Sequence, residues 1–319
     1  MTSSAHPRRR WRWLRMGIGA SLIILLIPIF GAPEFWQTLQ QVHLPLVIAA
    51  LGLSAASVIS KAWRWGVVLA WQGVEVSPQY LISGYFISMF FNNFLPSGMG
   101  GDVVRAYESA RDTGRGAESV TAVLIERGSG MLTVFGAGSV GALIVAVPPG
   151  VALLAHGLFW GGLIGVLMLW STRVGRALEW LGARLPVRLQ GLWGKGLRVI
   201  AAFRRTRREY RLLITVGLQS LVTLALTLAS VYALMLAFDE PIPFGAFAAA
   251  FAIITAVDVI PFSLNGIGVR ESSYVFFLGL SGARVEVALG VALLVRLLVL
   301  IQALGGGVLF LYKSWQKTP

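Results

Sequence analysis

The sequence FNNFLPSGMGGDVVRAYESAR, residues 91–111, decides how this chain folds. It interrupts an apolar stretch, residues 80–95, with Pro96 and three glycines before a polar and charged segment begins. Proline removes a backbone donor and clashes inside a helix, so we expect one helix to end here and another to begin near Asp102. Arg105 then lies close to the start of the second helix.

A second segment, IPFSLNGIGVRESSYVFFL at residues 260–278, has the same pattern. It also ends an apolar stretch, residues 244–260, and leads into a charged segment. The positions that match at identical spacing are Leu95, Pro96, Gly101, Val104 and Arg105 against Ile260, Pro261, Gly266, Val269 and Arg270. Looser counterparts farther along are Glu118 and Arg127 against Glu286 and Arg296. We interpret the match as an internal repeat.

The composition around these segments is that of an integral membrane protein. Of the 319 residues, 56% are hydrophobic and 13% are charged, and the mean hydropathy is +0.74, which excludes soluble and disordered classes. An apolar run at 16–30 lacks a small-residue cleavage site, so we expect a retained span and not a signal peptide. Further spans are expected at 44–70, 117–147, 151–170, 212–238 and 285–312. The predicted fold class is an all-α polytopic membrane protein with about six full spans.

The positive charge is concentrated outside the apolar runs. Of the 27 Lys and Arg residues, 18 lie in the tail at 1–15, in the linker at 173–211 or at the C-terminal end. Cytoplasmic loops carry such an excess, so we expect both termini and the linker to be cytoplasmic, in the cytoplasmic (inner or plasma) membrane. No nucleic-acid partner is expected. An amphipathic helix on the inner leaflet is predicted from the spacing of Val174, Leu178, Leu181 and Leu185.

Orientation determines what the two interrupted stretches are. If the first crossed completely, later spans would invert and the basic linker would lie outside. We therefore expect two re-entrant broken-helix hairpins, one entering from the cytoplasm and one from the exterior, in a pseudo-symmetric inverted repeat. This pattern is typical of transporters with a midplane site. The single transmembrane domain, 1–319, then comprises the basic tail 1–15, a first half 44–147 with its break near 96–101, a basic amphipathic linker 172–211, and a second half 212–312 with its break near 261–268.

The breaks combine features that favour an anion. Glycines allow close backbone approach, and each restarted helix directs free N–H groups at the break, where Arg105 and Arg270 can hold an acidic headgroup. The alternative is a structural ion pair with a nearby acid, which is Asp102, Glu108 or Glu126 for the first arginine and Asp258, Glu271 or Glu286 for the second. The candidate substrate-binding residues are Arg105, Arg270, Gly101, Gly266, Asn92, Asn93, Asn265, Arg127, Glu126 and Arg296.

Other charges lie inside or near the apolar runs. Glu126, Arg127 and Arg296 are expected to face inward, as ion pairs or as gating or substrate contacts, because charges at membrane depth are costly. Lys61 and Arg64 lie beside two tryptophans near one end of a span. We expect these two side chains to extend into an aromatic belt at the membrane surface.

Several kinds of chemistry find no support in the sequence. Cysteine is absent and the three histidines are scattered, so no metal site and no cofactor are expected. No G-x-x-x-x-G-K-[ST] loop for ATP occurs either. We expect no catalytic residues and do not expect an enzyme.

The two interrupted segments, with Ala62-Trp63-Arg64-Trp65 and Glu126-Arg127, resemble the flippase-like family related to the N-terminal transmembrane region of lysylphosphatidylglycerol synthases. The resemblance covers most of the chain. It implies movement of aminoacylated phospholipid between leaflets, and relatives accompany glycolipid, hopanoid and cell-envelope pathways. Arg105 and Arg270 match the family's motif arginines. The chain ends at Pro319, about where the synthases' soluble aminoacyl-transferase domain would begin, so lipid lysylation is not expected.

The expected function is therefore translocation of an anionic phospholipid or a lipid-linked glycan, with membrane lipids as partners. One alternative is a non-catalytic scaffold that docks a cell-envelope lipid or glycan synthesis enzyme. Another is an integral membrane lipid transferase, for which Asp102, Glu108 and Glu271 are the acids near the breaks.

The predicted topology can be tested with single cysteines, since the chain has none of its own. Ser171→Cys should be shielded from an impermeant thiol reagent added outside, whereas Gly150→Cys and Asp239→Cys should react with it. Labelling of Ser171→Cys from outside would contradict the re-entrant hairpins, because their orientation depends on a cytoplasmic linker.

Overall fold

The structure is a computed structural model that describes residues 33–94, 100–184, 186–239, 242–259 and 267–316. Within these ranges the regular secondary structure is helical and contains no strand, as predicted. The predicted span at 16–30 lies outside them. So do residues 95–99 and 260–266, which contain the prolines of both breaks together with Asn265 and Gly266.

Five of the helices described are long and apolar enough to cross a membrane. They are α3 (Leu44–Trp71), α6 (Gly116–Ile144), α7 (Pro149–Trp170), α10 (Tyr210–Ala237) and α13 (Val285–Gln316). Each coincides with a predicted span to within a few residues, so those five predictions are confirmed. Large apolar side chains are exposed on their outer surfaces, as expected for helices surrounded by lipid. The chain is a multi-pass membrane protein.

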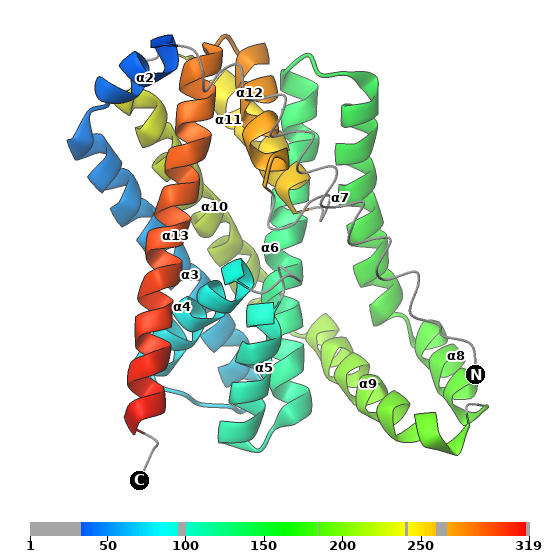
Figure 1. Cartoon of the computed structure of the whole chain (residues 1–319). Helices are drawn as coiled ribbons and strands as arrows, with labels where there is room; N and C mark the ends of the chain where they lie inside the picture. The colour runs from blue at the N-terminus through cyan, green and yellow to red at the C-terminus, as the bar shows by residue number, and fades with distance from the viewer. Residues whose placement is uncertain (1–32, 95–99, 185, 240–241, 260–266, 317–319) are drawn as a thin grey trace, which may run out of the picture.

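Four shorter helices form two pairs at opposite ends of the bundle (Figure 1). One pair consists of α4 (Pro78–Phe94) and α5 (Gly100–Thr113), which pack against each other at the end where the chain terminates. The other pair, α11 (Phe244–Asp258) and α12 (Val269–Leu280), is packed in the same way at the other end. The predicted apolar stretches at 80–95 and 244–260 are therefore separate short helices, each followed by another.

The helix packing follows one scheme in both halves of the chain. Helices α3 and α10 pack along each other, and α5 and α12 pack on the long helices that follow them, α6 and α13. The helices that precede the interruptions each pack on a long helix of the other half: α4 packs on α13, and α11 packs on α6. Each short pair is thus held between the two halves.

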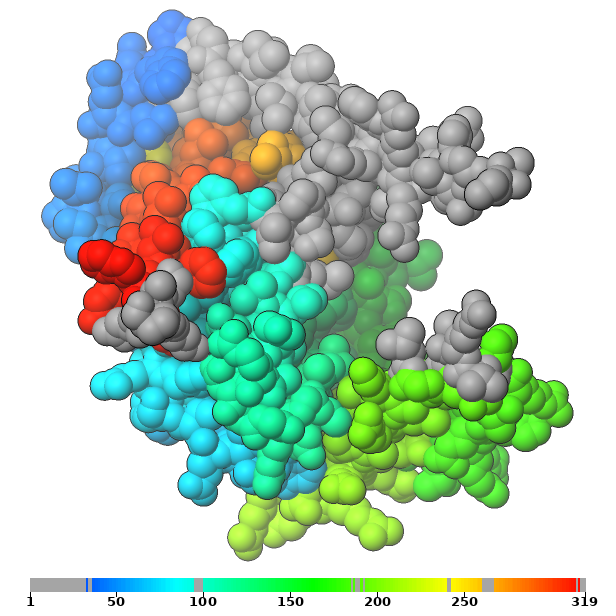
Figure 2. Space-filling model, turned by 60° about the horizontal axis from the view of Figure 1, so that its bottom comes forward, coloured from blue at the N-terminus to red at the C-terminus, as the bar shows by residue number. Residues whose placement is uncertain are grey.

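The basic linker forms two helices instead of the single amphipathic helix predicted. Helix α8 (Thr172–Ala183) ends shortly before Pro186, and α9 (Val187–Arg205) follows, with a short 3-10 turn, η1 (Thr206–Arg208), before α10. Proline disfavours helical backbone in the residue before it, which explains the division. The two helices project to one side of α5 at this end of the molecule (Figure 2). A further helix, α2 (Pro33–Gln40), packs on α13.

Close contact between α4 and α13 depends on Gly306. A Cβ atom there would overlap the carbonyl oxygen of Phe86, whereas a Cβ on the neighbouring Gly305 would meet nothing within 4 Å. The absence of a side chain at Gly306 therefore lets the two backbones approach.

This pair of adjacent glycines gives a matched test. Gly306→Ala should lower the melting temperature in detergent because the helices must separate. Gly305→Ala should leave it unchanged or raise it slightly, since alanine favours helix by up to about 1 kcal/mol over glycine. Equal melting temperatures would contradict the close packing of α4 on α13.

Candidate functional site

Glu126, on α6, is the centre of a buried charged cluster between α3, α4 and α5. Its Oε1 accepts a hydrogen bond from Nη2 of Arg64 at 2.6 Å and one from the Tyr85 hydroxyl at 3.3 Å. Its Oε2 accepts from Nη2 of Arg105 at 2.9 Å. The exposed fractions of Glu126, Arg64 and Arg105 are 1%, 3% and 2%. Two arginines therefore share one carboxylate in an apolar interior.

Arg105 is enclosed but not fully hydrogen-bonded. Its guanidinium lies over the rings of Trp65 and Tyr85, with Cζ 4.8 and 4.4 Å from their centroids. Its Nε and Nη1 are buried and have no hydrogen-bond partner in the part of the chain that is described. Buried donors without acceptors are costly, so these groups are candidates for contacting a ligand.

Asp102 and Arg127 complete this arrangement. Asp102 is 3.4 Å from Arg105 through Oδ1 and 3.2 Å from Arg127 through Oδ2. We call the residues Arg64, Tyr85, Asp102, Arg105, Glu126 and Arg127 the Glu126 cluster. Its three arginines face two carboxylates, which leaves one positive charge in excess.

A second cluster lies in the other short pair and on α13. Nε of Arg270 donates to Asp258 at 2.9 Å, and Arg296 donates to Glu271 at 2.6 Å. We call these four residues the Glu271 cluster. Its two arginines are balanced by two carboxylates, and their side chains are 24% and 23% exposed. The two clusters therefore differ in charge balance, and Arg64 and Arg105 are more deeply buried than either arginine of the Glu271 cluster, whereas the Arg127 side chain is 42% exposed.

Backbone N–H groups at the starts of α5 and α12 already have side-chain hydrogen-bond acceptors within the protein. The N–H of Gly101 donates to Oδ1 of Asn92 at 2.8 Å, and the N–H of Gly268 donates to Oε2 of Glu271 at 2.8 Å. A Cβ on Gly101 would overlap the carbonyl oxygen of Ser88. The predicted close approach at Gly101 is thus made by α4 itself.

The predicted site residues divide between the two clusters. Helix α5 begins at Gly100, so Arg105 lies in its second turn, beyond the terminal turn where a helix dipole acts. Arg105, Glu126 and Arg127 are brought together, and the ion-pair expectation holds for Arg105 with Asp102 and Glu126. Arg270 and Arg296 belong to the Glu271 cluster. The Asn92 side chain accepts a hydrogen bond from the Gly101 N–H, and the Asn93 side chain donates one to the Met89 carbonyl. Asn265 and Gly266 lie outside the described residues.

The prediction for Arg64 is wrong. Its side chain does not extend to a membrane surface but points inward, where it binds Glu126 and donates from Nη1 to the Ser220 hydroxyl on α10 at 2.8 Å. Sequence reasoning also missed Tyr85. For Arg64 a signal was present in the sequence: it is adjacent to Trp65, and Trp65 shares a helical face with Ala62 and Leu69, all three of which are buried.

Among the residues the structure describes, no group of three His, Asp or Glu residues could hold a metal ion. The fold and the buried charges together define a multi-pass helical membrane protein with an ionic site in its interior. The chain belongs to the family described as the lysylphosphatidylglycerol synthase TM region, whose model matches residues 12–306. The resemblance noted above is therefore confirmed.

The chain is also similar to a UPF0104 membrane protein of Pyrococcus horikoshii. The two are 27% identical over 95 residues, which is 30% of this chain and 28% of that protein. The matched part of the chain thus spans less than a third of the length of this relative. No solved structure matches the chain.

The importance of Glu126 can be measured by its removal. Glu126→Gln removes the carboxylate that pairs with Arg64 and leaves Arg105 paired with Asp102 alone among the described residues, and breaking a buried ion pair costs about 3–5 kcal/mol of unfolding free energy. Glu118→Gln, on the same helix, is the control, because the Glu118 carboxylate has no ion pair in the described structure. Unfolding should be followed in detergent, and equal stability of the two variants would contradict the central place of Glu126.

Proposed function

We propose that this protein translocates an anionic phospholipid, or a lipid-linked glycan with an acidic group, between membrane leaflets. The observation that carries the proposal is the Glu126 cluster, with the buried, unpartnered guanidinium donors of Arg105 and one positive charge in excess when the partly exposed Arg127 is included. Membership in a family of lipid metabolism supports a lipid as the substrate. The proposal requires no chemical change in the lipid.

We infer that α4–α5 and α11–α12 are re-entrant hairpins in an inverted repeat. The pairs lie at opposite ends of the bundle (Figure 1), and the crossed packing of α4 on α13 and α11 on α6 is what exchange of two equivalent halves would produce. The matching spacing of proline, glycine and arginine in the two halves also supports the repeat. Such repeats place substrate near the membrane midplane.

The Glu126 cluster is the better candidate for binding a headgroup. A phosphate would supply acceptors to Nε and Nη1 of Arg105 and would neutralise the excess charge. It would also compete with Glu126 for Nη2 of Arg105, so binding and release of the ion pair would be coupled. The balanced Glu271 cluster is better suited to holding α11, α12 and α13 together.

The orientation proposed for the chain follows from its cations. Both termini and the α8–α9 linker would lie on the cytoplasmic side of the cytoplasmic membrane, because arginine and lysine accumulate there. Helices α4 and α5 would then enter from the cytoplasm. A headgroup would reach the Glu126 cluster from that side.

Arg105→Gln tests the headgroup site. Loss of a charge-assisted contact should weaken binding of phosphatidylglycerol by about ten- to a hundredfold and slow its exchange between liposome leaflets. Arg105→Lys should rescue only partly, since an ammonium lacks the guanidinium fork. Exchange of fluorescent phosphatidylglycerol and phosphatidylcholine should be compared.

Two variants serve as controls. Arg111→Gln removes an arginine at the exposed end of α5, where it pairs with Asp112, and should leave binding and exchange unchanged. Arg270→Gln should lower the melting temperature without changing lipid selectivity. Unchanged phosphatidylglycerol binding in Arg105→Gln would refute the proposed site, and no exchange by the unmodified protein would favour the scaffold alternative.

A further inference from the structure

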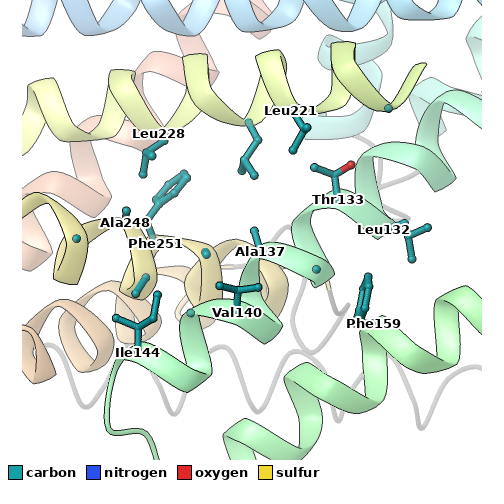
Figure 3. A pocket seen from close by; sticks show the side chains of 17 residues that line it. Leu132, Thr133, Ala137, Val140, Ile144, Phe159, Leu221, Leu228, Ala248 and Phe251 are labelled. Atoms are coloured by element: carbon teal, nitrogen blue, oxygen red, sulfur yellow. The ribbon is translucent and has the colours of Figure 1, made fainter. Parts of the chain in front are cut away.

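A long apolar groove runs along α6 beside the Glu126 cluster. It is walled by α6, α10 and α11, with Phe159 of α7 at one side, and has a volume of about 740 Å³. Figure 3 shows Thr133 and Leu221 toward one end of the groove and Ile144 and Leu228 toward the other. None of the sequence motifs predicts it, because its walls come from three separate helices.

The lining of the groove suits hydrocarbon. Thr133 is its one polar side chain among the described residues, and that hydroxyl already donates to the Ser129 carbonyl. Val140, Ile144 and Leu221 on its walls are 57%, 64% and 56% exposed, and in a membrane these surfaces contact lipid tails. The groove therefore offers no hydrogen bond to a headgroup.

One end of the groove adjoins the Glu126 cluster. On α10, Ser220 accepts a hydrogen bond from Arg64, and Gly217 and Leu221 of the same turn line the groove. On α6, a Cβ on Gly130 would be 3.0 Å from Nη2 of Arg64, and Thr133 lies within one turn of it. The groove therefore begins within one helical turn of Ser220 and Gly130, the residues that contact or adjoin Arg64.

The length of the groove corresponds to one lipid tail. From Leu132 to Ile144 the α6 wall rises about 18 Å at ~1.5 Å per residue. One leaflet contributes about half of the ~30 Å hydrocarbon thickness of a bilayer, or ~15 Å. The volume also lies within the ~300–1,000 Å³ typical of ligand sites.

We propose that this groove binds one acyl chain of an anionic phospholipid whose headgroup contacts the Glu126 cluster. The inference rests on the proposed function for the identity of the headgroup. The charged cluster holds the head in the half of the bundle that contains α4 and α5, and the groove directs the tail toward the half that contains α11 and α12. The protein therefore recognises both parts of the lipid.

A photo-crosslinking residue can identify what occupies the groove. Phe159→p-benzoylphenylalanine places the probe on the wall with little change in shape, and Trp160→p-benzoylphenylalanine places it on the adjacent residue, which does not line the groove. The full chain is reconstituted in vesicles of equal phosphatidylglycerol and phosphatidylethanolamine, irradiated and analysed by mass spectrometry. We expect phosphatidylglycerol to be the predominant adduct at position 159, with no preference at position 160.

A bulky side chain in the groove provides the second measurement. Neither Gly217 nor Gly245 has an atom within 4 Å of an added Cβ, so Gly217→Leu and Gly245→Leu should fold normally while filling the two ends. Each should reduce the phosphatidylglycerol adduct at position 159 by about tenfold, equivalent to ~1.4 kcal/mol, because the leucine side chain fills space that the acyl chain would occupy. Gly157→Leu, at an open position on α7 outside the groove, should not.

The other outcomes would overturn the proposal. They are equal adducts of both lipids at position 159, a crosslink from position 159 to residues 16–30 of the same chain, and an adduct that Gly217→Leu leaves unchanged. Adduct formation does not require transport. If the protein captures phosphatidylglycerol in the groove but does not exchange it between leaflets, the proposed translocation is refuted and the groove site is retained. If it exchanges the lipid without capturing it in the groove, the groove site is refuted and the proposed translocation is retained.

Discussion

The cost of burying charge in an apolar interior governs this structure. Glu126 offsets that cost for Arg64 and Arg105 together, and Arg64 also binds Ser220. These contacts join α3, α5, α6 and α10, which come from both halves of the chain. The position of α5 is therefore fixed by electrostatics as well as by packing, because moving Arg105 away would break its buried ion pair with Glu126 and leave that carboxylate paired with Arg64 alone among the described residues.

The two halves share a helix arrangement but use their charges differently. In both, an arginine on the long following helix pairs with an acid near the start of the short helix, as Arg127 does with Asp102 and Arg296 with Glu271. The other arginine differs, since Arg105 shares a carboxylate with Arg64 whereas Arg270 has Asp258. The charges of the Glu271 cluster therefore balance, whereas the Glu126 cluster has one arginine in excess, which is why the proposed headgroup site lies in the first half.

Much of the fold could be predicted because its signals are local. Each span is a continuous apolar run, and α4 and α11 end where proline and glycine interrupt such runs, so the bounds of α3, α6, α7, α10 and α13 were predicted closely. The linker was less predictable, because apolar residues at helical spacing continue to Leu185 in the sequence, whereas α8 ends at Ala183, shortly before Pro186. Arg105, Arg270 and their candidate acids were identifiable as charges beside such interruptions.

The sequence by itself determined that the chain spans a membrane, where it is interrupted, and that arginines follow the interruptions, because hydropathy and proline act on neighbouring residues. Only the tertiary structure decided that Arg105 and Arg64 share Glu126, that Asn92 contacts Gly101, and that α6, α10 and α11 enclose a groove. These features depend on the rotation of each helix about its axis. Packing between distant segments sets that rotation, and a turn of one residue, ~100° at 3.6 residues per turn, decides whether Arg64 faces lipid or Glu126.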